Sequence, residues 1–567
     1  MFVKTTKSKN YEYIKLVESY REDGTTKHRV LYNFGRRDLI RNDQMFINMV
    51  KKLCEIAELP TSGERQAALA DCSEATMLNY GYLAYAKLWE TLGIANCLQN
   101  IREQSKISFQ ITDTAFLMAV QHLLSPRSKL ATYKHQNSYF GLKEAKLQHL
   151  YRTLDKLCEE NEFIESELFR QNYQIYGQQV DVVFYDVITF AFESVIADEL
   201  RNFGFSKDCK FKEVQVVMGL LIDTNGLPIG YELFAGNTFD GKTMVRSLEN
   251  LQKRFGINRV IIVADRGINS KGNLRLIKEA GYGYIVASKI KDMSEKILTA
   301  IFDESGYTSL KDKNGDAFRY KTLSYTNVFK DENRQQHQLE ESLVVSFSEK
   351  RAKKDKSDRE RLIEKARKLL KNPESIKAAN KRGGKKYLRD TSTQKATWEL
   401  DETKITQDTR FDGYYGIQTS EKEMSALDVM DAYHTLWKIE DSFRIMKSTL
   451  EVRPVFHWTP NRIRGHFMLC FLSFLMERKL EMLLSDEKLS GLEVSPDRIQ
   501  EALNTMQLAA VTVNREETYI KVKNQPLGSQ IFKKLKLQVP KNISTKEEIL
   551  GCLQPKKKKS WGQLRLF

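Results

Sequence analysis

Residues 179–194 read QVDVVFYDVITFAFES, and VVFYDV at 182–187 is a continuous apolar strand with one acidic residue inside it, Asp186. Continuous apolar runs of this length are typical of strands buried on both faces of a sheet. A carboxylate in such a strand is costly unless it is paired or bound to a metal. Asp186 is therefore more informative than most aspartates of the chain.

The pattern that follows this stretch predicts a mixed α/β sheet. Strands are predicted at 212–223, 227–237, 258–267 and 284–290, and helices at 243–256 and 271–283. In the order β-β-β-α-β-α-β, the first and fourth strands can lie side by side. This would bring Asp186 close to Asp265, at the end of the fourth strand, where functional groups gather in α/β sheets.

A third acidic residue, Glu440, lies in the helix-like stretch YHTLWKIEDSFRIMK at 433–447. Positions seven apart on an α-helix point in nearly the same direction. One face would then carry Tyr433, Leu436, Glu440, Arg444 and Lys447. That face offers a metal ligand, two cations for phosphates and an aromatic ring, although by itself the pattern also fits an amphipathic surface helix.

Three carboxylates from a sheet and one packed helix suit a two-metal site. Two divalent cations held by shared carboxylates activate the attacking oxygen and stabilise the leaving oxygen. Asp186, Asp265 and Glu440 are the predicted set, whereas Asp223 and Asp441 are interpreted as structural. The chain has no GxxxxGK[ST], HExxH or GxSxG motif, so ATP-driven and common hydrolytic chemistries are not indicated.

Composition indicates a soluble globular chain with a polyanionic partner. The 567 residues exceed one core and predict two to four domains, and 41% are hydrophobic. The net charge of +16 favours nucleic acid, although a merely basic protein would also show it. None of the seven cysteines forms a CxxC pair, and no apolar run is long enough to span a bilayer. We expect a cytoplasmic protein with no membrane partner.

Changes of pattern divide the chain into six segments. We expect a β-hairpin and helices at 1–72, a helical DNA-binding region at 73–175, a catalytic core at 176–290 and 426–485, a β-rich insertion at 291–425, and a C-terminal region with a basic tail at 486–567. Basic helices serve DNA binding and plain scaffolding equally well. The Lys- and Arg-rich stretch 349–386 is likewise either a DNA-backbone contact or an exposed helix and loop.

Several motifs together resemble the DDE transposases of bacterial insertion sequences, in their cut-and-paste branch. They are FYDVITFAFES (184–194), GLPIGYELFAGNTFDGKT (226–243), ADRGINS (264–270) and the Glu440 stretch. The family's last helix reads Y-x2-R-x3-E-x6-K, and here the positions hold Tyr433, Leu436, Glu440 and Lys447. Leu436 departs from the family arginine, and Arg444 is the expected substitute.

The resemblance covers roughly residues 1–480 and implies an RNase H-like mixed sheet flanked by helices, with a β-rich insertion and an N-terminal mainly helical domain. It implies Mg²⁺, with Mn²⁺ as a substitute, bound by the three carboxylates. Double-stranded DNA would be the partner, first as terminal inverted repeats and then as target DNA. A homodimer on DNA, associated with the bacterial nucleoid, would cut in trans.

Further residues are expected to bind DNA near the cut: Tyr433, Arg444, Lys447 and Arg266, which directly follows Asp265. Relatives cut through a hairpin intermediate, aided by a tryptophan that stacks on a flipped base. Trp398 in the insertion is the candidate here, because base–aromatic stacking is favourable. Packing of a large side chain inside the insertion is the simpler interpretation of Trp398.

Two other functions remain open on the sequence. One is an RNase H-like DNA nuclease that cleaves without strand transfer. The other is a catalytically inactive, DNA-binding derivative, and the presence of all three carboxylates argues against it.

Overall fold

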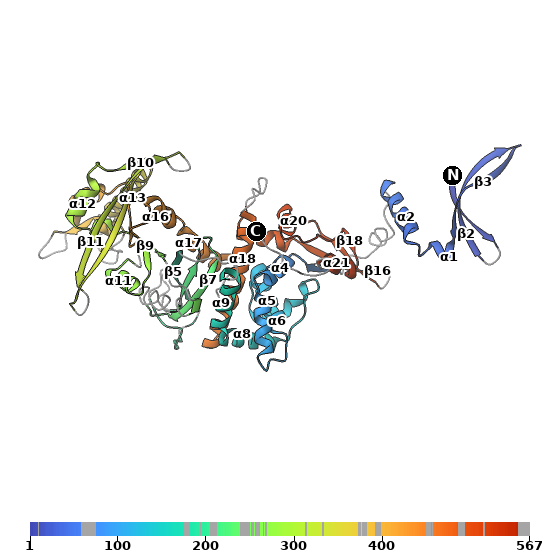
Figure 1. Cartoon of the computed structure of the whole chain (residues 1–567), viewed down its shortest axis with the longest axis horizontal. Coiled ribbons are helices and arrows are strands. Elements are labelled where there is room, and N and C mark those ends of the chain that lie inside the picture. The colour runs from blue at the N-terminus through green and yellow to red at the C-terminus, as the bar shows by residue number, and fades with distance from the viewer. Residues whose placement is uncertain are drawn as a thin grey trace. The chain divides into compact units, whose positions relative to one another are not determined.

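The computed structural model divides the chain into two compact units, each considered by itself. The main unit is Tyr82–Asn137 with Gly141–Leu503, and the terminal unit is Met1–Gly81 with Ser138–Phe140 and Asn504–Phe567 (Figure 1). The described residues are 1–8, 11–57, 75–174, 182–192, 194, 196–204, 213–238, 250, 254–255, 261–264, 266, 269–311, 315–330, 334–371, 376, 383–391, 398–449, 455, 457–485, 494–513 and 516–553.

A mixed sheet forms the centre of the main unit. Its first five strands in chain order are β5 (Val182–Ala191), β6 (Gln215–Ile222), β7 (Pro228–Ala235), β8 (Ile261–Ala264) and β9 (Gly283–Ala287). The strands β5, β6 and β7 form an antiparallel meander, and β8 pairs in parallel with both β5 and β9. The order β9-β8-β5-β6-β7, with β6 reversed, is that of the RNase H-like fold. The predicted neighbourhood of the first and fourth strands is confirmed.

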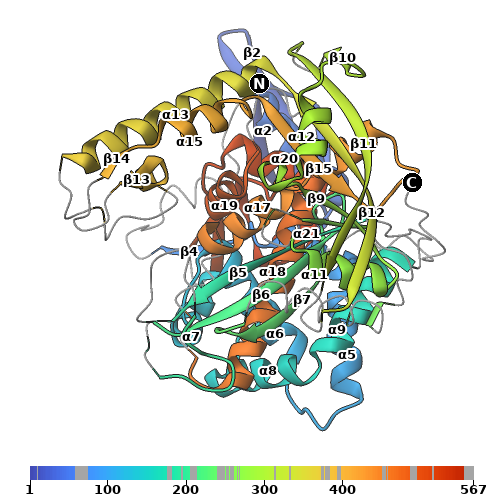
Figure 2. The ribbon, with the colours of Figure 1, turned by 90° about the vertical axis from the view of Figure 1, so that its left-hand side faces the viewer.

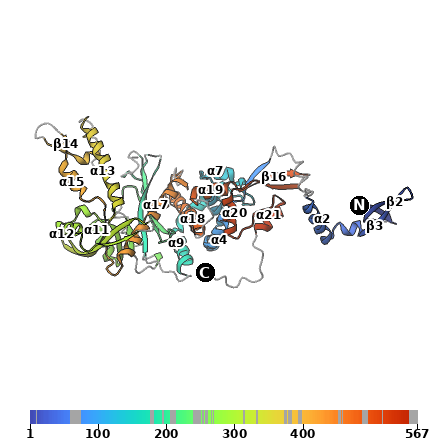
Figure 3. The same cartoon turned by 90° about the horizontal axis from the view of Figure 1, so that it is seen from above.

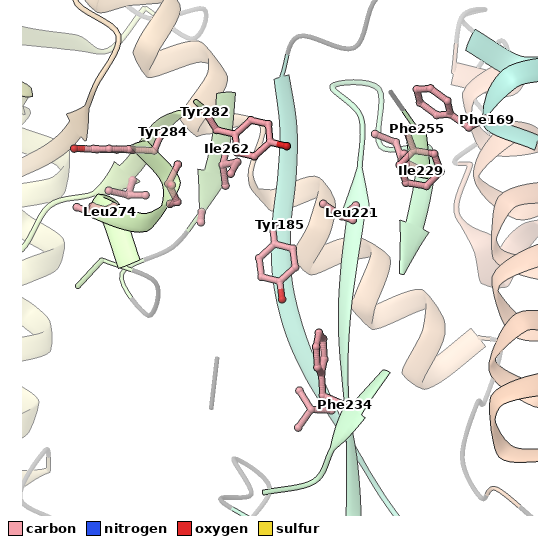
Figure 4. Packing of buried hydrophobic residues seen from close by; sticks show 14 of the residues in the cluster. Phe169, Tyr185, Leu221, Ile229, Phe234, Phe255, Ile262, Leu274, Tyr282 and Tyr284 are labelled. Atoms are coloured by element: carbon pink, nitrogen blue, oxygen red, sulfur yellow. The ribbon is translucent and has the colours of Figure 1, made fainter. Parts of the chain in front are cut away.

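Apolar side chains from these strands and from α11 (Lys271–Glu279) fill one core (Figure 4). Tyr185, Leu221, Ile262 and Tyr284 contribute from four neighbouring strands, and each is almost completely buried. Every residue of β6 is buried, as its continuous apolar run predicts. Burying one such side chain contributes about 1.5–3 kcal/mol, so the sheet is a rigid support. The helix predicted at 243–256 lies almost entirely outside the described residues.

The insertion continues the same sheet. Its elements are α12 (Glu295–Phe302), β10 (Thr308–Lys311), β11 (Ala317–Lys330), β12 (Gln336–Phe347), α13 (Glu349–Leu370), β13 (Leu388–Asp390), β14 (Trp398–Leu400), α15 (Glu402–Thr409) and β15 (Tyr414–Thr419). The strand β15 pairs with β9 on one side and β12 on the other, so β10, β11, β12 and β15 extend the sheet. The helices α13 and α15 and the β13–β14 pair lie together around a small core of their own (Figures 2 and 3).

The part of the main unit that precedes β5 in the chain is helical. They are α4 (Leu83–Thr91), α5 (Ile94–Glu103), α6 (Ile111–Leu124), α7 (Lys129–His135), α8 (Leu147–Glu159) and α9 (Asn161–Phe169). The helix α6 ends at the predicted Ser125-Pro126 break. The predicted long buried helix is α18 (Pro460–Ser485), which packs against α4, α6, α8 and β7. The helix α19 (Pro496–Asn504) follows it along the chain.

The terminal unit contains the predicted N-terminal hairpin and a sheet that the sequence did not indicate. The strands β1 (Phe2–Ser8), β2 (Tyr11–Glu22) and β3 (Thr25–Arg36) precede α1 (Arg37–Ile40) and α2 (Gln44–Ile56). Asp23 and Gly24 both have positive φ, as the two-residue turn requires. The expectation of a helical region over 73–175 is wrong near its start, since β4 (Thr76–Asn79) is a strand.

The partner of β4 explains this difference. It pairs with β16 (Gln507–Val513) in a sheet with β17 (Glu516–Lys521) and β18 (Ile543–Ser544), beside α20 (Pro526–Lys534) and α21 (Lys546–Leu553). A four-residue strand is specified by this distant partner rather than by its own pattern. Within the described ranges, no helix combines the length and the apolarity that crossing a membrane requires.

The close approach of α18 to α8 gives a test of the fold. A Cβ on Gly465 would lie 1.9 Å from the Leu154 carbonyl oxygen, a backbone atom that cannot turn aside. We expect Gly465→Ala to lower the free energy of unfolding by at least about 2 kcal/mol. Gly272→Ala in α11 is the matched control, because its Cβ would meet nothing within 4 Å. Calorimetric melting should show a lower Tm for Gly465→Ala alone, and equal melting of the two variants would contradict this packing.

Candidate active site

The register between β5 and β8 pairs residues that are 79 positions apart in the sequence, which is also the spacing of the first two predicted carboxylates. Val182, Val183 and Phe184 pair with Ile261, Ile262 and Val263, each partner lying 79 positions further along the chain. Asp186 and Asp265 are separated by the same 79 positions. Asp186 is a described backbone position within β5, opposite Leu220 of β6. Asp265 is the next residue after β8 in the sequence and lies outside the described residues.

Glu440 lies on α17 (Trp437–Arg444), which packs against β5, the strand of Asp186. Ile439 and Phe443 are buried beneath the helix, whereas Glu440 is exposed. The preceding helix, α16 (Ala426–His434), packs over β8, β9 and β15. The two helices therefore pack on strands of this sheet, and the helix of the third predicted carboxylate contacts the strand of the first.

Residues on both sides of Glu440 fix α17 to the turn between β6 and β7. The Lys438 ammonium donates a hydrogen bond to the Thr224 carbonyl oxygen at 2.6 Å. Asp441 accepts a hydrogen bond from Arg478 of α18 at 3.0 Å, and Arg478 also donates to the Gly226 carbonyl oxygen at 3.2 Å. These contacts support the interpretation of Asp441 as structural.

Asp223 also has a structural role, since its carboxylate accepts hydrogen bonds from the backbone of Asn225 and Leu227 and from the Tyr173 hydroxyl. Burial raises the pKa of Asp223 above its ordinary value, even though these hydrogen bonds favour the ionised form. The carboxylate completes the β6–β7 turn to which α17 is attached.

The expectation of one continuous helix over 433–447 is wrong. The helix α16 ends at His434, and Leu436 and Ile439 make tight bonds back to the carbonyls of Tyr433 and Leu436, each spanning three residues. A π-helical turn, Ile445–Thr449, follows α17. Leu436 is buried and Glu440 is exposed, so the five predicted residues do not share one face. The tight turn before α17 and the π-helical turn after it break the ideal 3.6-residue repeat.

The predicted DNA-binding residues of this stretch are therefore placed separately. Tyr433 is half-buried in the last turn of α16, and Lys447 is half-buried in the π-helical turn. Arg444 is 56% exposed and pairs with Asp441, which raises the pKa of its guanidinium. Leu436, at the position of the family arginine, is packed in the interior and offers no group to a phosphate.

Arg266 and Tyr433 meet at a residue that sequence reasoning missed, Tyr415 of β15. The Tyr415 hydroxyl hydrogen-bonds the Tyr433 hydroxyl at 2.9 Å. The guanidinium of Arg266 lies 5.5 Å from the centre of the Tyr415 ring, and that of Arg351 lies 4.3 Å from it. No local signal singles out Tyr415, because its importance depends on the pairing of β15 between β9 and β12.

A polar cleft of about 710 Å³ opens beside these residues, between the end of β9 and the insertion helix α13. Six of its lining residues are cationic and five are aspartates. Asp408 accepts hydrogen bonds from Lys291, Lys386 and Tyr387. Burial would raise the pKa of Asp408, but these three donors lower it to about 2. The paired charges hold α15 and the loop before β13 against the core.

Trp398 packs inside the insertion, as the simpler interpretation of the sequence expects, and a different tryptophan is exposed near Glu440. Trp398 packs against the small core of the insertion around Ala366 and Tyr387, with the Lys385 ammonium 5.7 Å from its ring centre. Trp437, in contrast, is 58% exposed at the start of α17, three residues before Glu440. The signal that could have identified Trp437 is its i,i+3 spacing from the predicted carboxylate.

Among the residues that the structure describes, no group of three or more His, Cys, Asp and Glu side chains is arranged to hold a metal ion. Of the predicted set, Asp265 and the side chain of Asp186 lie outside the described residues. The donor chemistry nonetheless suits Mg²⁺, which prefers carboxylate oxygens.

Two family models match the chain. Residues 3–60 match the N-terminal domain of IS1634 family transposases, and residues 199–476 match the transposase DDE domain. The chain belongs to the DDE transposases of bacterial insertion sequences. It is a DNA transposase, and the DDE match includes Asp265 and Glu440 while beginning after Asp186.

Other comparisons add little to this assignment. No curated protein sequence matches the transposase. A solved piggyBac transposase, in a synaptic complex with hairpin DNA, matches with a TM-score of 0.34 and 10% identity, over 86% of this chain and 89% of that one. The RNase H-like assignment therefore comes from the strand order of the transposase itself.

The Asp408 cluster of the transposase predicts a pH-dependent contribution to stability. We expect Asp408→Asn to lower the free energy of unfolding at pH 7 by about 1–2 kcal/mol, a modest value because Lys291 is half exposed. The folded pKa lies below the ordinary 3.8, so the contribution is present above pH 3.8 and lost as the pH falls toward 2.

Urea unfolding at pH 7 and at pH 3 would test this. The difference in the free energy of unfolding between wild type and Asp408→Asn, the stability gap, should be smaller at pH 3 than at pH 7. The control is Glu402→Gln, an exposed carboxylate on the same helix, which should change little at either pH. A gap that widens at pH 3 would show that the ionised form of Asp408 is not the stabilising one.

Proposed function

We propose that the transposase cleaves the ends of its insertion sequence and joins them to target DNA by two-metal phosphodiester chemistry at Asp186, Asp265 and Glu440. The observation that carries the proposal is the shared 79-residue offset of the β5–β8 pairing and of the two aspartates, with α17 packed on β5. If the register continues past Phe184 and Val263, Asp186 and Asp265 are neighbours, and Glu440 approaches from α17.

The three carboxylates would hold Mg²⁺, with Mn²⁺ as a substitute. When bound, such ions activate the attacking oxygen and stabilise the leaving oxygen of the phosphodiester. Glu440 suits this role because it is exposed, while Lys438 beside it is bonded to the β6–β7 turn and Asp441 to Arg478 of α18. Carboxylates on a rigid sheet and a fixed helix need little rearrangement to receive the ions.

The remaining residues would bind and orient the DNA. Water would attack the phosphodiester at each element end, and the freed 3′-hydroxyl would attack the opposite strand to form a hairpin. A second water would open the hairpin and regenerate the 3′-hydroxyl, which then attacks the target. Tyr433, Lys447, Arg266 and Arg444 would contact phosphates near the cut, Arg444 after exchange of its partner Asp441. The net charge of +16 favours association with DNA, and a homodimer acting in trans belongs to the same proposal through the resemblance to the family.

A cleavage assay with the full-length protein and a duplex carrying the element's own ends tests this function. We expect Mg²⁺-dependent cutting at the element boundary, absent in EDTA. Asp186→Asn, Asp265→Asn and Glu440→Gln should each slow cutting by about a thousandfold or more, because each removes several kcal/mol of transition-state stabilisation.

The controls separate catalysis from binding and folding. Glu423→Gln removes an exposed carboxylate in the bend three residues before α16 and should cut normally. The three catalytic variants should bind the duplex in a gel-shift assay as wild type does. Joined products with target DNA distinguish a transposase reaction from nuclease action alone, and cutting that survives Asp265→Asn would refute the site.

The exposure of Trp437 and the packing of Trp398 lead to opposite predictions for the two tryptophans. We expect Trp437→Ala to reduce hairpin formation on the element ends by about tenfold, through loss of base stacking, with little change in Tm. Trp398→Ala should lower the Tm, because its ring packs in the insertion core. Hairpin yield on denaturing gels and calorimetric melting measure the two effects. A hairpin defect in Trp398→Ala at unchanged Tm would reverse the assignment.

A further inference from the structure

Tyr415 connects three separate parts of the main unit. Its hydroxyl donates to the Tyr433 hydroxyl at 2.9 Å, and the two ring centres are 5.8 Å apart. Tyr433 lies in the last turn of α16, seven residues before Glu440. The Tyr415 ring also lies beneath Arg351, in the first turn of α13, and near Arg266, which directly follows Asp265.

The backbone around Tyr415 is fixed from both sides. Tyr415 pairs with Ser346 of β12, and two residues later Ile417 pairs with Ala287 of β9. The Ser288 amide donates to the Gly416 carbonyl oxygen at 2.8 Å. Tyr415 therefore stands where the insertion strands join the core sheet, and its half-buried ring has a rigid support.

We propose that Tyr415 is a positioning residue of the transposase, which orients the Tyr433 hydroxyl and makes its position depend on Arg351 of the insertion. The inference rests on the proposed function, in which Tyr433 binds a phosphate next to the Glu440 site. The Tyr433 oxygen accepts this hydrogen bond from the Tyr415 hydroxyl, which restrains where the Tyr433 hydroxyl lies.

The Arg351 contact extends this link to α13. The guanidinium plane over an aromatic ring is a directional contact that a lysine reproduces poorly. The first turn of α13 is itself held by the Ser348 side chain, which caps the helix, and by the Ser348 amide, which donates to the Gly413 carbonyl oxygen at 3.2 Å. A shift of α13 would therefore be transmitted to Tyr415 and from it to Tyr433.

A double-mutant cycle on the full-length protein tests the proposal. We expect Tyr415→Phe and Tyr433→Phe each to slow single-turnover cleavage of an element-end duplex about three- to tenfold, the effect of one lost hydrogen bond. The double variant should be no slower than Tyr433→Phe alone, because Tyr415 acts through that hydroxyl. Arg351→Lys should slow cleavage in the wild-type background and have no further effect in Tyr433→Phe.

Several readouts separate positioning from folding. DNA affinity and Tm should stay unchanged in Tyr415→Phe. Tyr320→Phe on β11 is the matched control and should cut normally, since no hydrogen bond of its hydroxyl is found within the described part of the chain. Multiplicative effects in the double variant would overturn the inference.

The Glu440→Gln variant distinguishes this inference from the proposed function. Normal cutting by Tyr415→Phe, together with lost cutting in Glu440→Gln, would overturn the role of Tyr415 and leave the proposed function intact. Cutting that survives Glu440→Gln would overturn the proposed function, and the role of Tyr415 at that site with it.

Discussion

The candidate site depends on the parallel pairing of β5 with β8. The two strands are far apart in the sequence, and their register pairs Val182, Val183 and Phe184 with the residues 79 positions later. The antiparallel meander of β6 and β7 occupies the other edge of β5, which leaves the edge facing β8 available for this pairing. Buried side chains on four neighbouring strands hold the register, because a one-residue slip would turn each apolar side chain to the opposite face.

The helices α16 and α17 supply the rest of the site by packing on strands of this sheet. They are attached through side chains that are not themselves predicted to be catalytic: Lys438 to the β6–β7 turn, and Asp441 to Arg478 of α18. Glu440 lies between these attachments and stays exposed. The insertion is likewise joined to the core by β15, which pairs with β9 and β12. Its strands therefore extend the sheet of the proposed carboxylates, and helix α13 follows β12 along the chain.

The sequence predicted the main-unit sheet well, because apolar runs and turn signals there coincide with the strands. It failed where the structure depends on distant partners. The four residues of β4 become a strand only through β16, more than 400 positions away. The proposed role of Tyr415 depends on strand pairing and on contacts with two arginines. The sequence around Tyr415 contains no pattern that predicts either of them.

Two elements of the candidate site lie in contact, while the set of three carboxylates stays a prediction. The strand of Asp186 and the helix of Glu440 are in contact, as the carboxylate hypothesis requires. The idealised helix over 433–447 misled, because an ideal 3.6-residue repeat cannot represent a tight turn before α17 and a π-helical turn after it. Leu436 was assigned to the same face as Glu440 and is instead buried. Trp437 was overlooked although its spacing from Glu440 is visible in the sequence.

The most direct test of the central claim is to locate the bound metal on the polypeptide. Fe²⁺ would replace Mg²⁺ in the full-length transposase bound to an element-end duplex, and radical cleavage of the backbone with ascorbate and peroxide would be mapped by mass spectrometry. Asp186, Asp265 and Glu440 as shared ligands predict three sets of cuts, close to residues 186, 265 and 440, all suppressed by excess Mg²⁺. Mg²⁺-sensitive cuts confined to other parts of the chain would contradict the site.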